Sequence, residues 1–264
     1  MTGENKIILA AHRGDRKNYP ENTMPAFRAA ADFGADMIET DLHMTRDGVL
    51  IIMHDRSALR TAGVDRNVDE MTLREVQELD AGGQFSPAFA GTKVPTLEEF
   101  LTFVRETPLT VNWELKDYPH LVGDDHAFAA ADKLIDMVEA YGMTERSMFN
   151  SFSDRVLEHI VRRVGHRCPI HGQGIYRCRR TKDEPTLPET ELFDWCCMYP
   201  EQEGGNPVDF PDSFRYCTER GIRPCVCIED REDTYRTALA LGCRMFTSND
   251  IHAADAVLRR LGVR

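Results

Sequence analysis

Short apolar runs alternate with amphipathic segments along most of the chain. Nine runs are four to seven residues long and are bounded by glycine, proline or polar residues, which is typical of strands. They lie at residues 6–11, 37–41, 49–53, 109–115, 148–152, 169–175, 195–199, 222–228 and 244–247. Helices are predicted at residues 26–33, 72–79, 96–106, 124–141, 154–164, 211–220, 231–241 and 252–261, several of which stop at a glycine.

The spacing of these strands predicts the fold. A (β/α)8 barrel has eight parallel strands, so one of the nine runs must lie outside it. Only residues 42–48 separate the second run from the third, whereas a parallel crossover needs about a dozen residues. We therefore expect the run at 49–53 to pair antiparallel with an extension of the second strand. The prediction is an α/β fold, a single (β/α)8 TIM barrel over residues 1–264 with a small insertion after the second strand.

The insertion is predicted at about residues 56–94, which are rich in glycine and carry one short helix. It displaces the helix that should follow the second strand to residues 96–106. A doubly wound open sheet is the alternative fold. The chain does not favour it, because no glycine-rich phosphate loop follows the first strand.

Charge and hydropathy narrow the classes of function. The formal net charge of the 264 residues is −12, which argues against nucleic acid as a partner. The N-terminus has only five apolar residues before His12, too few for a signal peptide, and no run approaches the roughly 18 apolar residues of a membrane helix. We expect a cytoplasmic protein without an integral membrane segment. None of the eight cysteines forms a C-x-x-C pair, so buried free thiols are expected rather than a zinc finger.

The chemistry centres on Glu39-Thr40-Asp41, at the end of the second strand. Residues two apart on a strand share one face, so these two carboxylates project together and repel unless a cation joins them. Two solvated acids are the ordinary explanation of an isolated E-x-D. Here, however, Glu114 ends the next barrel strand, and oxygen-only ligands suit Mg²⁺ or Ca²⁺. The three acids therefore predict a site for one divalent metal ion.

Four further residues stand at strand ends near these acids. Arg13 and Lys116 are cations that suit a phosphate group. His12 and His54 are bases that can work as a general acid–base pair near neutral pH. Each has an ordinary structural explanation when taken alone. Together, at the C-terminal ends of barrel strands, they predict an active site.

These motifs resemble the glycerophosphodiester phosphodiesterase family. The resemblance is dense over residues 7–116 and thinner beyond. In the related sphingomyelinase-D-type phospholipases the first histidine lies closer to the carboxylates, whereas here His12 precedes Glu39 by 27 residues. The matching stretches are His12-Arg13-Gly14, Glu21-Asn22-Thr23, Gly34-Ala35-Asp36, Glu39-Thr40-Asp41, Thr45-Arg46-Asp47-Gly48, His54-Asp55, Val94-Pro95-Thr96-Leu97, Glu114-Leu115-Lys116 and Ser151-Phe152.

The resemblance implies that a divalent metal helps to hydrolyse a small glycerophosphodiester to sn-glycerol 3-phosphate and an alcohol. It assigns metal binding to Glu39, Asp41 and Glu114, and phosphate binding to Arg13 with help from Lys116. His12 and His54 would be base and acid, in either order, and water or a glycerol hydroxyl would attack phosphorus. Substrate-side positions are expected at Glu21, Asn22, Ser151, Phe152 and Arg177.

The last third of the chain departs from the family pattern. Where the family usually has W-T-V-N, this chain has Cys227-Ile228-Glu229-Asp230, and Thr247-Ser248-Asn249-Asp250 replaces the closing T-D-x-P. We expect both changes to affect the substrate-side rim and not the metal ligands. The loop at 176–194 carries Arg177, Arg179, Arg180 and Lys182, either as a solvated loop or as a cationic lid for an acidic head group.

Three alternative functions differ in chemistry. A lysophospholipase-D-type phosphodiesterase would use the same site on a lysophospholipid. A non-catalytic phosphoester-binding barrel would not need two histidines. Another metal-dependent barrel enzyme, such as an aldolase or an enolising lyase, would need a reactive lysine, for which Lys116 is the sequence's only choice, and would leave His12-Arg13-Gly14 unexplained. The oligomeric state is left open.

Overall fold

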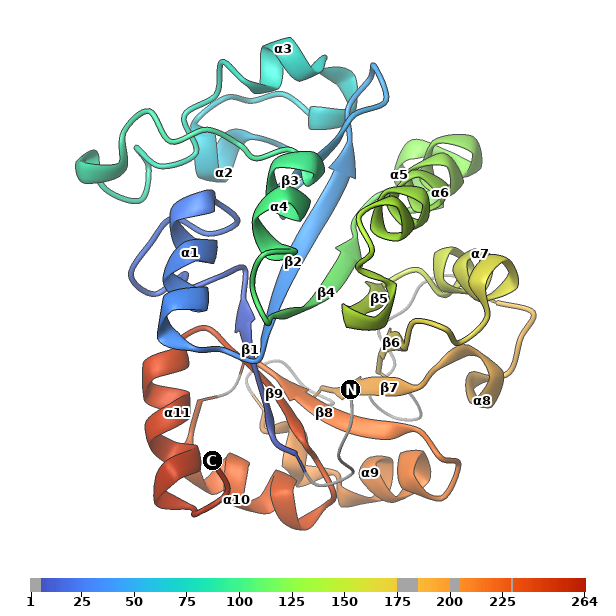
Figure 1. Cartoon of the computed structure of the whole chain (residues 1–264). Coiled ribbons are helices and arrows are strands. Elements are labelled where there is room, and N and C mark those ends of the chain that lie inside the picture. Colours follow the sequence, from blue (N-terminus) through green and yellow to red (C-terminus); the bar gives the residue numbers. More distant parts are fainter. Residues whose placement is uncertain (1–5, 175–184, 200–204, 229) are drawn as a thin grey trace.

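The computed structural model describes residues 6–174, 185–199, 205–228 and 230–264, and it confirms the predicted TIM barrel (Figure 1). Eight parallel strands follow one another around the barrel, and pairing of β1 with β2 closes it. The register places His12 beside Glu39 and Asp41 beside Glu114. The barrel strands are β1 (Ile8–His12), β2 (Met37–Met44), β4 (Thr110–Leu115), β5 (Ser147–Ser151), β6 (Ile170–Gln173), β7 (Trp195–Met198), β8 (Arg223–Cys227) and β9 (Met245–Ser248).

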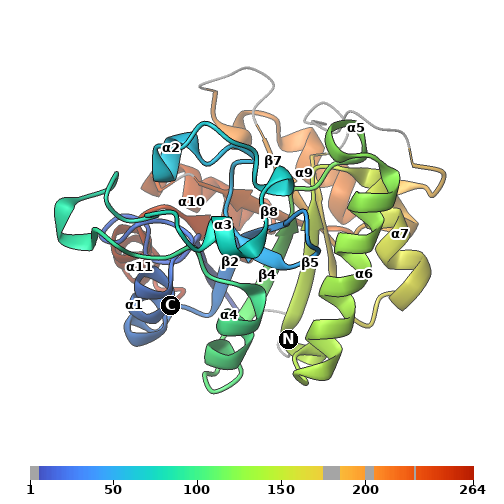
Figure 2. The same cartoon turned by 90° about the horizontal axis from the view of Figure 1, so that it is seen from above.

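The ninth strand, β3 (Leu50–Ile52), lies outside the barrel, as predicted. It pairs antiparallel with the last three residues of β2, with Leu42 opposite Ile52. The inserted segment follows it and lies beyond the C-terminal end of β2 (Figures 1 and 2). This segment builds a small apolar core of its own, which includes Val68, Met71 and Val76. Its elements are α2 (Leu59–Ala62), η1 (Val68–Glu70), α3 (Leu73–Val76) and η2 (Pro87–Phe89).

The outer helices cover the barrel and bury the main apolar core against the outward faces of its strands. Helix α4 starts where the prediction placed it, because Thr96 and Glu99 form a capping box. One short helix, α8 (Glu189–Leu192), lies within residues 176–194, for which no helix was predicted. The remaining helices are α1 (Met24–Phe33), α4 (Leu97–Val104), α5 (Pro119–Val122), α6 (Asp124–Ala140), η3 (Thr144–Arg146), α7 (Asp154–Val164), α8 (Glu189–Leu192), η5 (Pro207–Asp209), α9 (Pro211–Thr218), α10 (Glu232–Ala240) and α11 (Ile251–Arg260).

The barrel interior is divided into an apolar floor and a polar upper part. Met37, Met148, Trp195 and Met245 are among the residues that pack together in the floor. The inward side chains nearer the C-terminal ends of the strands are polar and surround a cavity. The site therefore rests on a filled core, as is usual for this fold. Within the described residues, no helix is both long enough and apolar enough to cross a membrane.

Candidate functional site

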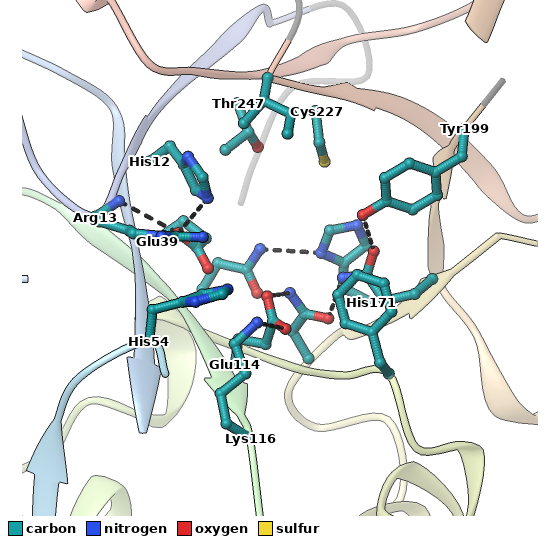
Figure 3. Close-up of a pocket in the computed structure, with 15 residues that line it drawn as sticks. His12, Arg13, Glu39, His54, Glu114, Lys116, His171, Tyr199, Cys227 and Thr247 are labelled. Carbon is teal, nitrogen blue, oxygen red and sulfur yellow. Dashed lines mark hydrogen bonds and ion pairs between the residues drawn. The ribbon is translucent and has the colours of Figure 1, made fainter. Parts of the chain in front are cut away.

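Three buried carboxylates meet at the ends of β2 and β4, as the sequence predicts. Oxygen atoms of Glu39, Asp41 and Glu114 all lie within 4.8 Å of one another. Glu39 and Asp41 share one face of β2, and the strand register brings Glu114 next to Asp41. Glu39 and Glu114 line a cavity of about 170 Å³ at the mouth of the barrel, and Asp41 is fully buried beside them (Figure 3).

The electrostatics of this cluster suit a divalent cation. Burial, followed by the charges of Asp41 and Glu114, raises the pKa of Glu39 well above its usual range. Burial also raises the pKa of Glu114. Glu39 Oε1 is buried and has no hydrogen-bond partner among the described residues. Buried carboxylates that repel each other and leave an oxygen unpaired are a fitting ligand set for Mg²⁺ or Ca²⁺.

Two buried cations partly offset the three acids. Lys116 Nζ contacts Glu114 and lies 3.1 Å from Asp41 Oδ1. Arg13 Nε lies 3.2 Å from Asp41 Oδ2. Burial opposes ionisation of Asp41, but Lys116 and Arg13 outweigh it and lower the pKa of that carboxyl. With the carboxylates ionised, one negative charge remains uncompensated in the cluster.

The turn after β1 holds Arg13 in a strained backbone conformation. Arg13 has a left-handed φ of 60°, which is uncommon for a residue with a side chain, and its N–H donates to Glu39 O at 2.8 Å. Gly14 follows with φ of 80°, and a Cβ there would lie 2.8 Å from Ala26 of α1. Glycine is therefore required at this position because the turn packs directly against the helix.

His12 lies at the end of β1, above the carboxylates. Its Nδ1 is 2.5 Å from Asn249 Oδ1, and its Nε2 is 3.8 Å from Glu39 Oε2. Burial, and next the charge of Arg13, lowers the pKa of His12 to about 3. The contact corrects one expectation, because the departure from T-D-x-P after β9 reaches His12 itself and not only the substrate-side rim.

His54 follows β3 and reaches the cavity from outside the barrel wall. Its Nδ1 lies 2.5 Å from Asp55 Oδ1, and Arg60 donates to the other oxygen of Asp55 at 2.5 Å. Burial lowers the pKa of His54, and the charge of Lys116 acts in the same direction. The Asp55 carboxylate opposes this shift. Figure 3 shows His12 and His54 approaching the space above Glu39 from different directions.

The expected substrate-side residues separate into different groups. Asn22 was expected at the substrate side, but it is buried and donates to Asp41 Oδ2 at 2.8 Å, so it orients a carboxylate. Ser151 was also expected there, but it is buried and donates to Leu115 O. Glu21 accepts from Arg13 at 2.9 Å and binds two more arginines beside the cavity, whereas Phe152 lines the cavity. Arg177, with Arg179, Arg180 and Lys182, lies outside the described residues.

Several polar residues of the cavity were not predicted. Asn150 Nδ2 donates to Glu114 Oε2 at 3.4 Å, Gln173 donates to Asn150 Oδ1 at 2.5 Å, and Tyr199 donates to Gln173 Oε1 at 2.7 Å. This chain of contacts runs from the metal-ligand cluster across the cavity (Figure 3). The available signal was a period of two on β4 and β6, where the inward-facing residues are polar and the residues between them are apolar or glycine. Asn112 and His171 are further unpredicted lining residues, whereas Cys227, Ile228 and Thr247 belong to the two stretches that were expected at the substrate-side rim.

Comparison with known proteins gives one consistent result. The model of the "Glycerophosphoryl diester phosphodiesterase family" matches residues 12–190. The chain is 37% identical over 261 residues to a "Glycerophosphodiester phosphodiesterase" of Caldanaerobacter subterraneus subsp. tengcongensis, covering 97% of this chain and 100% of that protein. It is 29% identical to the "Probable glycerophosphodiester phosphodiesterase 2" of Mycobacterium tuberculosis, covering 88% of this chain and 83% of that one.

Solved structures show the same fold at lower identity. A putative glycerophosphoryl diester phosphodiesterase from Silicibacter pomeroyi superposes with a TM-score of 0.81 at 21% identity, covering 98% of this chain and 95% of that one. A phosphodiesterase from Oleispira antarctica, solved in complex with the product sn-glycerol-3-phosphate, superposes with a TM-score of 0.79 at 17% identity, covering 96% of both chains.

Proposed function

The chain belongs to the glycerophosphoryl diester phosphodiesterase family, and we propose that it hydrolyses glycerophosphodiesters to sn-glycerol 3-phosphate and an alcohol with the help of a divalent metal ion. One observation carries the proposal. A cluster of three carboxylates, two of which line the cavity at the mouth of the barrel, lies with two cations and the imidazoles of His12 and His54 around that cavity. A site that only bound a phosphoester would not need two groups able to transfer protons.

The charges favour a phosphodiester as the ligand. Glu39, Asp41 and Glu114 carry three negative charges, and Arg13 and Lys116 carry two positive charges. A divalent cation held by the carboxylates would leave one net positive charge, which matches the single negative charge of a phosphodiester. When bound, the ion would supply positive charge against the phosphoryl oxygens as negative charge develops on them. Arg13 would bind the phosphate beside it.

The partners of the two histidines favour different protonation states. Asn249 is neutral and accepts from Nδ1–H of His12, which leaves Nε2 as a base directed at the cavity. Asp55 is a carboxylate, and its charge stabilises a protonated His54. We therefore assign the role of general base to His12 and that of general acid to His54.

The reaction follows from these positions. His12 Nε2 accepts a proton from the attacking oxygen, which belongs to water or to a neighbouring glycerol hydroxyl. A new bond forms between that oxygen and phosphorus, and the bond from phosphorus to the departing alcohol oxygen breaks. His54 gives its proton to this oxygen, so the alcohol leaves neutral. Attack by water gives sn-glycerol 3-phosphate in one step, whereas attack by the hydroxyl gives a cyclic phosphate that water must then open.

A second cavity favours a lysophospholipid as the alternative substrate. This cavity has a volume of about 570 Å³ and shares His54, Lys116 and Phe152 with the first. Its other lining residues include Tyr118 and Leu121. Leu121 is 45% exposed, so an apolar surface stands next to the proposed acid. An acyl chain fits such a surface better than the small polar alcohol of a deacylated glycerophosphodiester does.

The histidines provide the test of the mechanism. We expect His12→Gln and His54→Gln each to lower kcat by ~10²–10⁴-fold, with little change in substrate affinity, because positioned acids and bases act on the transition state. The losses should not multiply in the double variant, since the two groups act as a unit. A p-nitrophenyl phosphodiester, whose leaving group needs no proton, should restore most of the rate of His54→Gln but not of His12→Gln.

Two outcomes would change the proposal. Near wild-type turnover of glycerophosphodiesters by both single variants would contradict two-histidine catalysis. Rescue of His12→Gln in place of His54→Gln would reverse the two roles. Parallel assays of glycerophosphodiesters and lysophospholipids with Mg²⁺, Ca²⁺ and EDTA would then decide between the two substrate classes and test the metal requirement.

A further inference from the structure

A second group of potential metal ligands lies on the other side of the barrel from the carboxylates. It consists of His171 on β6, Cys197 on β7, and Cys225 and Cys227 on β8. One nitrogen and three sulfur atoms all lie within 4.8 Å of one another. Figure 3 shows His171 and Cys227 across the cavity from His54 and Glu39. The proposed hydrolysis uses none of these four residues.

Strand geometry explains why the four side chains converge. Cys225 and Cys227 are two residues apart on β8 and therefore share its inward face. Cys197 is paired with Cys225 in the register of β7 and β8, so it points the same way. His171 lies two strands from Cys225, and its Nε2 is 3.2 Å from Cys225 Sγ. The arrangement needs three adjacent parallel strands, which is why no short Cys-x-x-Cys motif marks it.

The distances are close to those of a tetrahedral zinc site. A Zn–S bond of about 2.3 Å places two sulfur ligands about 3.8 Å apart. The present spread of up to 4.8 Å lies within about 1 Å of that separation, a difference that side-chain rotation can close. Three thiolates and one imidazole form an established set of ligands for structural zinc, whereas Mg²⁺ and Ca²⁺ prefer oxygen.

His171 is held as a zinc-bound histidine usually is. Its Nδ1 lies 2.9 Å from the side-chain amide of Asn112, on the side away from the sulfurs. Asn112 Oδ1 is buried and has no hydrogen-bond partner among the described residues. Turning the amide by 180° lets this oxygen accept from Nδ1–H, which satisfies it and leaves the Nε2 lone pair directed at the cysteines. A zinc-bound histidine commonly donates its other N–H to such an acceptor.

We propose that His171, Cys197, Cys225 and Cys227 bind a zinc ion that joins β6, β7 and β8. Four protein ligands leave no open coordination position, so the ion is structural and takes no part in the hydrolysis. Cys227 and His171 line the cavity, which gives the ion a path of entry. The described cysteines are free thiols, so these sulfurs are available to a metal. Any of these thiols that is protonated would release its proton when the ion binds, because the thiolate is the form that binds a metal.

The test uses the whole chain and a metal whose spectrum reports its ligands. The protein is purified under reducing conditions, stripped with a chelator and titrated with Co²⁺. We expect one equivalent to produce the near-ultraviolet thiolate-to-cobalt band and the strong visible bands of tetrahedral coordination, and Zn²⁺ to displace it. Cys225→Ser and Cys227→Ser should each weaken the thiolate band and the binding of Co²⁺, because each removes one of three sulfur ligands. Cys168→Ser is the matched control, because Cys168 is a buried cysteine outside the cluster, and it should keep them.

Further measurements separate this site from the carboxylate site and from misfolding. Asp41→Asn should keep the thiolate band, because oxygen ligands do not contribute to it. Circular dichroism of each variant shows whether loss of the band reflects unfolding, and Cys227→Ser is the less disruptive variant because Cys227 is only half-buried. Three results would overturn the proposal. They are no thiolate band in the folded reduced wild type, a band of undiminished intensity in folded Cys227→Ser, and a disulfide within the cluster in protein purified without reductant or oxidant.

Discussion

The two sides of the barrel mouth are built from different chemistry. The side formed by β1, β2 and β4 carries carboxylates, a guanidinium, an ammonium and His12, and His54 reaches it from the end of β3. The side formed by β6, β7 and β8 carries three thiols, an imidazole and a tyrosine. Both sides are formed by the C-terminal ends of parallel strands in the same barrel. The difference therefore arises from the identity of the inward-facing residues and not from the fold.

The contrast separates two ways of neutralising a buried polar cluster. On the first side burial raises the pKa of Glu39 and of Glu114, and Arg13 and Lys116 offset the charge of the acids. On the second side burial raises the pKa of Cys197 and of Cys225, whereas hydrogen bonds to these two residues lower the pKa of Cys227. The first side therefore balances charge with basic side chains, and the second with hydrogen bonds between its own sulfur atoms. Because the proposed hydrolysis uses only the first side, removing a residue there should cost more activity.

The largest effect is expected from the carboxylates. Glu39→Ala, Asp41→Ala and Glu114→Ala should each lower the metal-dependent rate by at least ~10²–10³-fold, because each removes a carboxylate that would hold the cation opposite the reacting phosphate. Cys168→Ser is the control and should keep the wild-type rate, because Cys168 precedes β6 and lies outside both clusters. Turnover of a glycerophosphodiester against metal concentration measures the effect. Wild-type activity in any two of the three variants, with metal still required, would contradict the assignment.

A smaller effect is expected from Asn249, which follows β9 and contacts His12 on the first side. Asn249→Ala removes the partner of His12 Nδ1 and should lower kcat about tenfold, in line with the loss of one hydrogen bond of about 1.4 kcal/mol. Asn249→Asp supplies a carboxylate, which should raise the pKa of His12 and move the acidic limb of the kcat–pH profile upward. A purely structural role for Asn249 would change stability and leave that limb in place.

Low pH should lower the free energy of unfolding through His12, which lies on the first side. The pKa of His12 is about 3 in the folded protein and near 6.5 when the chain is unfolded, so between these values the unfolded chain binds more protons. Folding should therefore lose up to about 1.4 kcal/mol per pH unit from this residue as the pH falls from 6.5 towards 3. His12→Gln should remove that part of the slope. Denaturant unfolding in EDTA at several pH values measures it, and equal slopes in wild type and variant would contradict the expectation.

The smallest effect is expected at the link between the two sides. Tyr199→Phe removes the hydroxyl that donates to Gln173, at the far end of the contacts leading to Glu114. The loss should be about 0.5–1.5 kcal/mol, which appears as a fall in metal affinity of a few-fold. Calorimetric titration with Mg²⁺ measures it. An unchanged affinity would mean that the two sides act independently.

The sequence predicted the first side well because its residues stand next to each other in short motifs. Glu39 and Asp41 are two residues apart, so strand periodicity brings them to one face, and His12 and Arg13 form one short motif at the end of the first strand. The antiparallel position of β3 followed from a connection too short for a parallel crossover. These are local inferences that depend on one strand and the turn beside it.

The second side could not be predicted in this way. His171 and Cys227 are 56 residues apart, and only the register of three strands brings them to one point. The contact between His12 and Asn249 is similar, because it depends on the closure of the barrel between β9 and β1. Asn22 and Ser151 were misplaced for a related reason. Their motifs predicted the region of the site in which each residue lies, but not the direction in which its side chain points.

The position of β3 outside the barrel has a consequence for motion. His54 follows a strand that pairs with β2 alone among the barrel strands and leads into a segment with its own small core. Transient opening of that segment would withdraw His54 while the barrel and the carboxylates stay folded. The frequency of such subglobal openings, measured by native-state hydrogen exchange, would then set the fraction of molecules that have a complete catalytic pair at any moment.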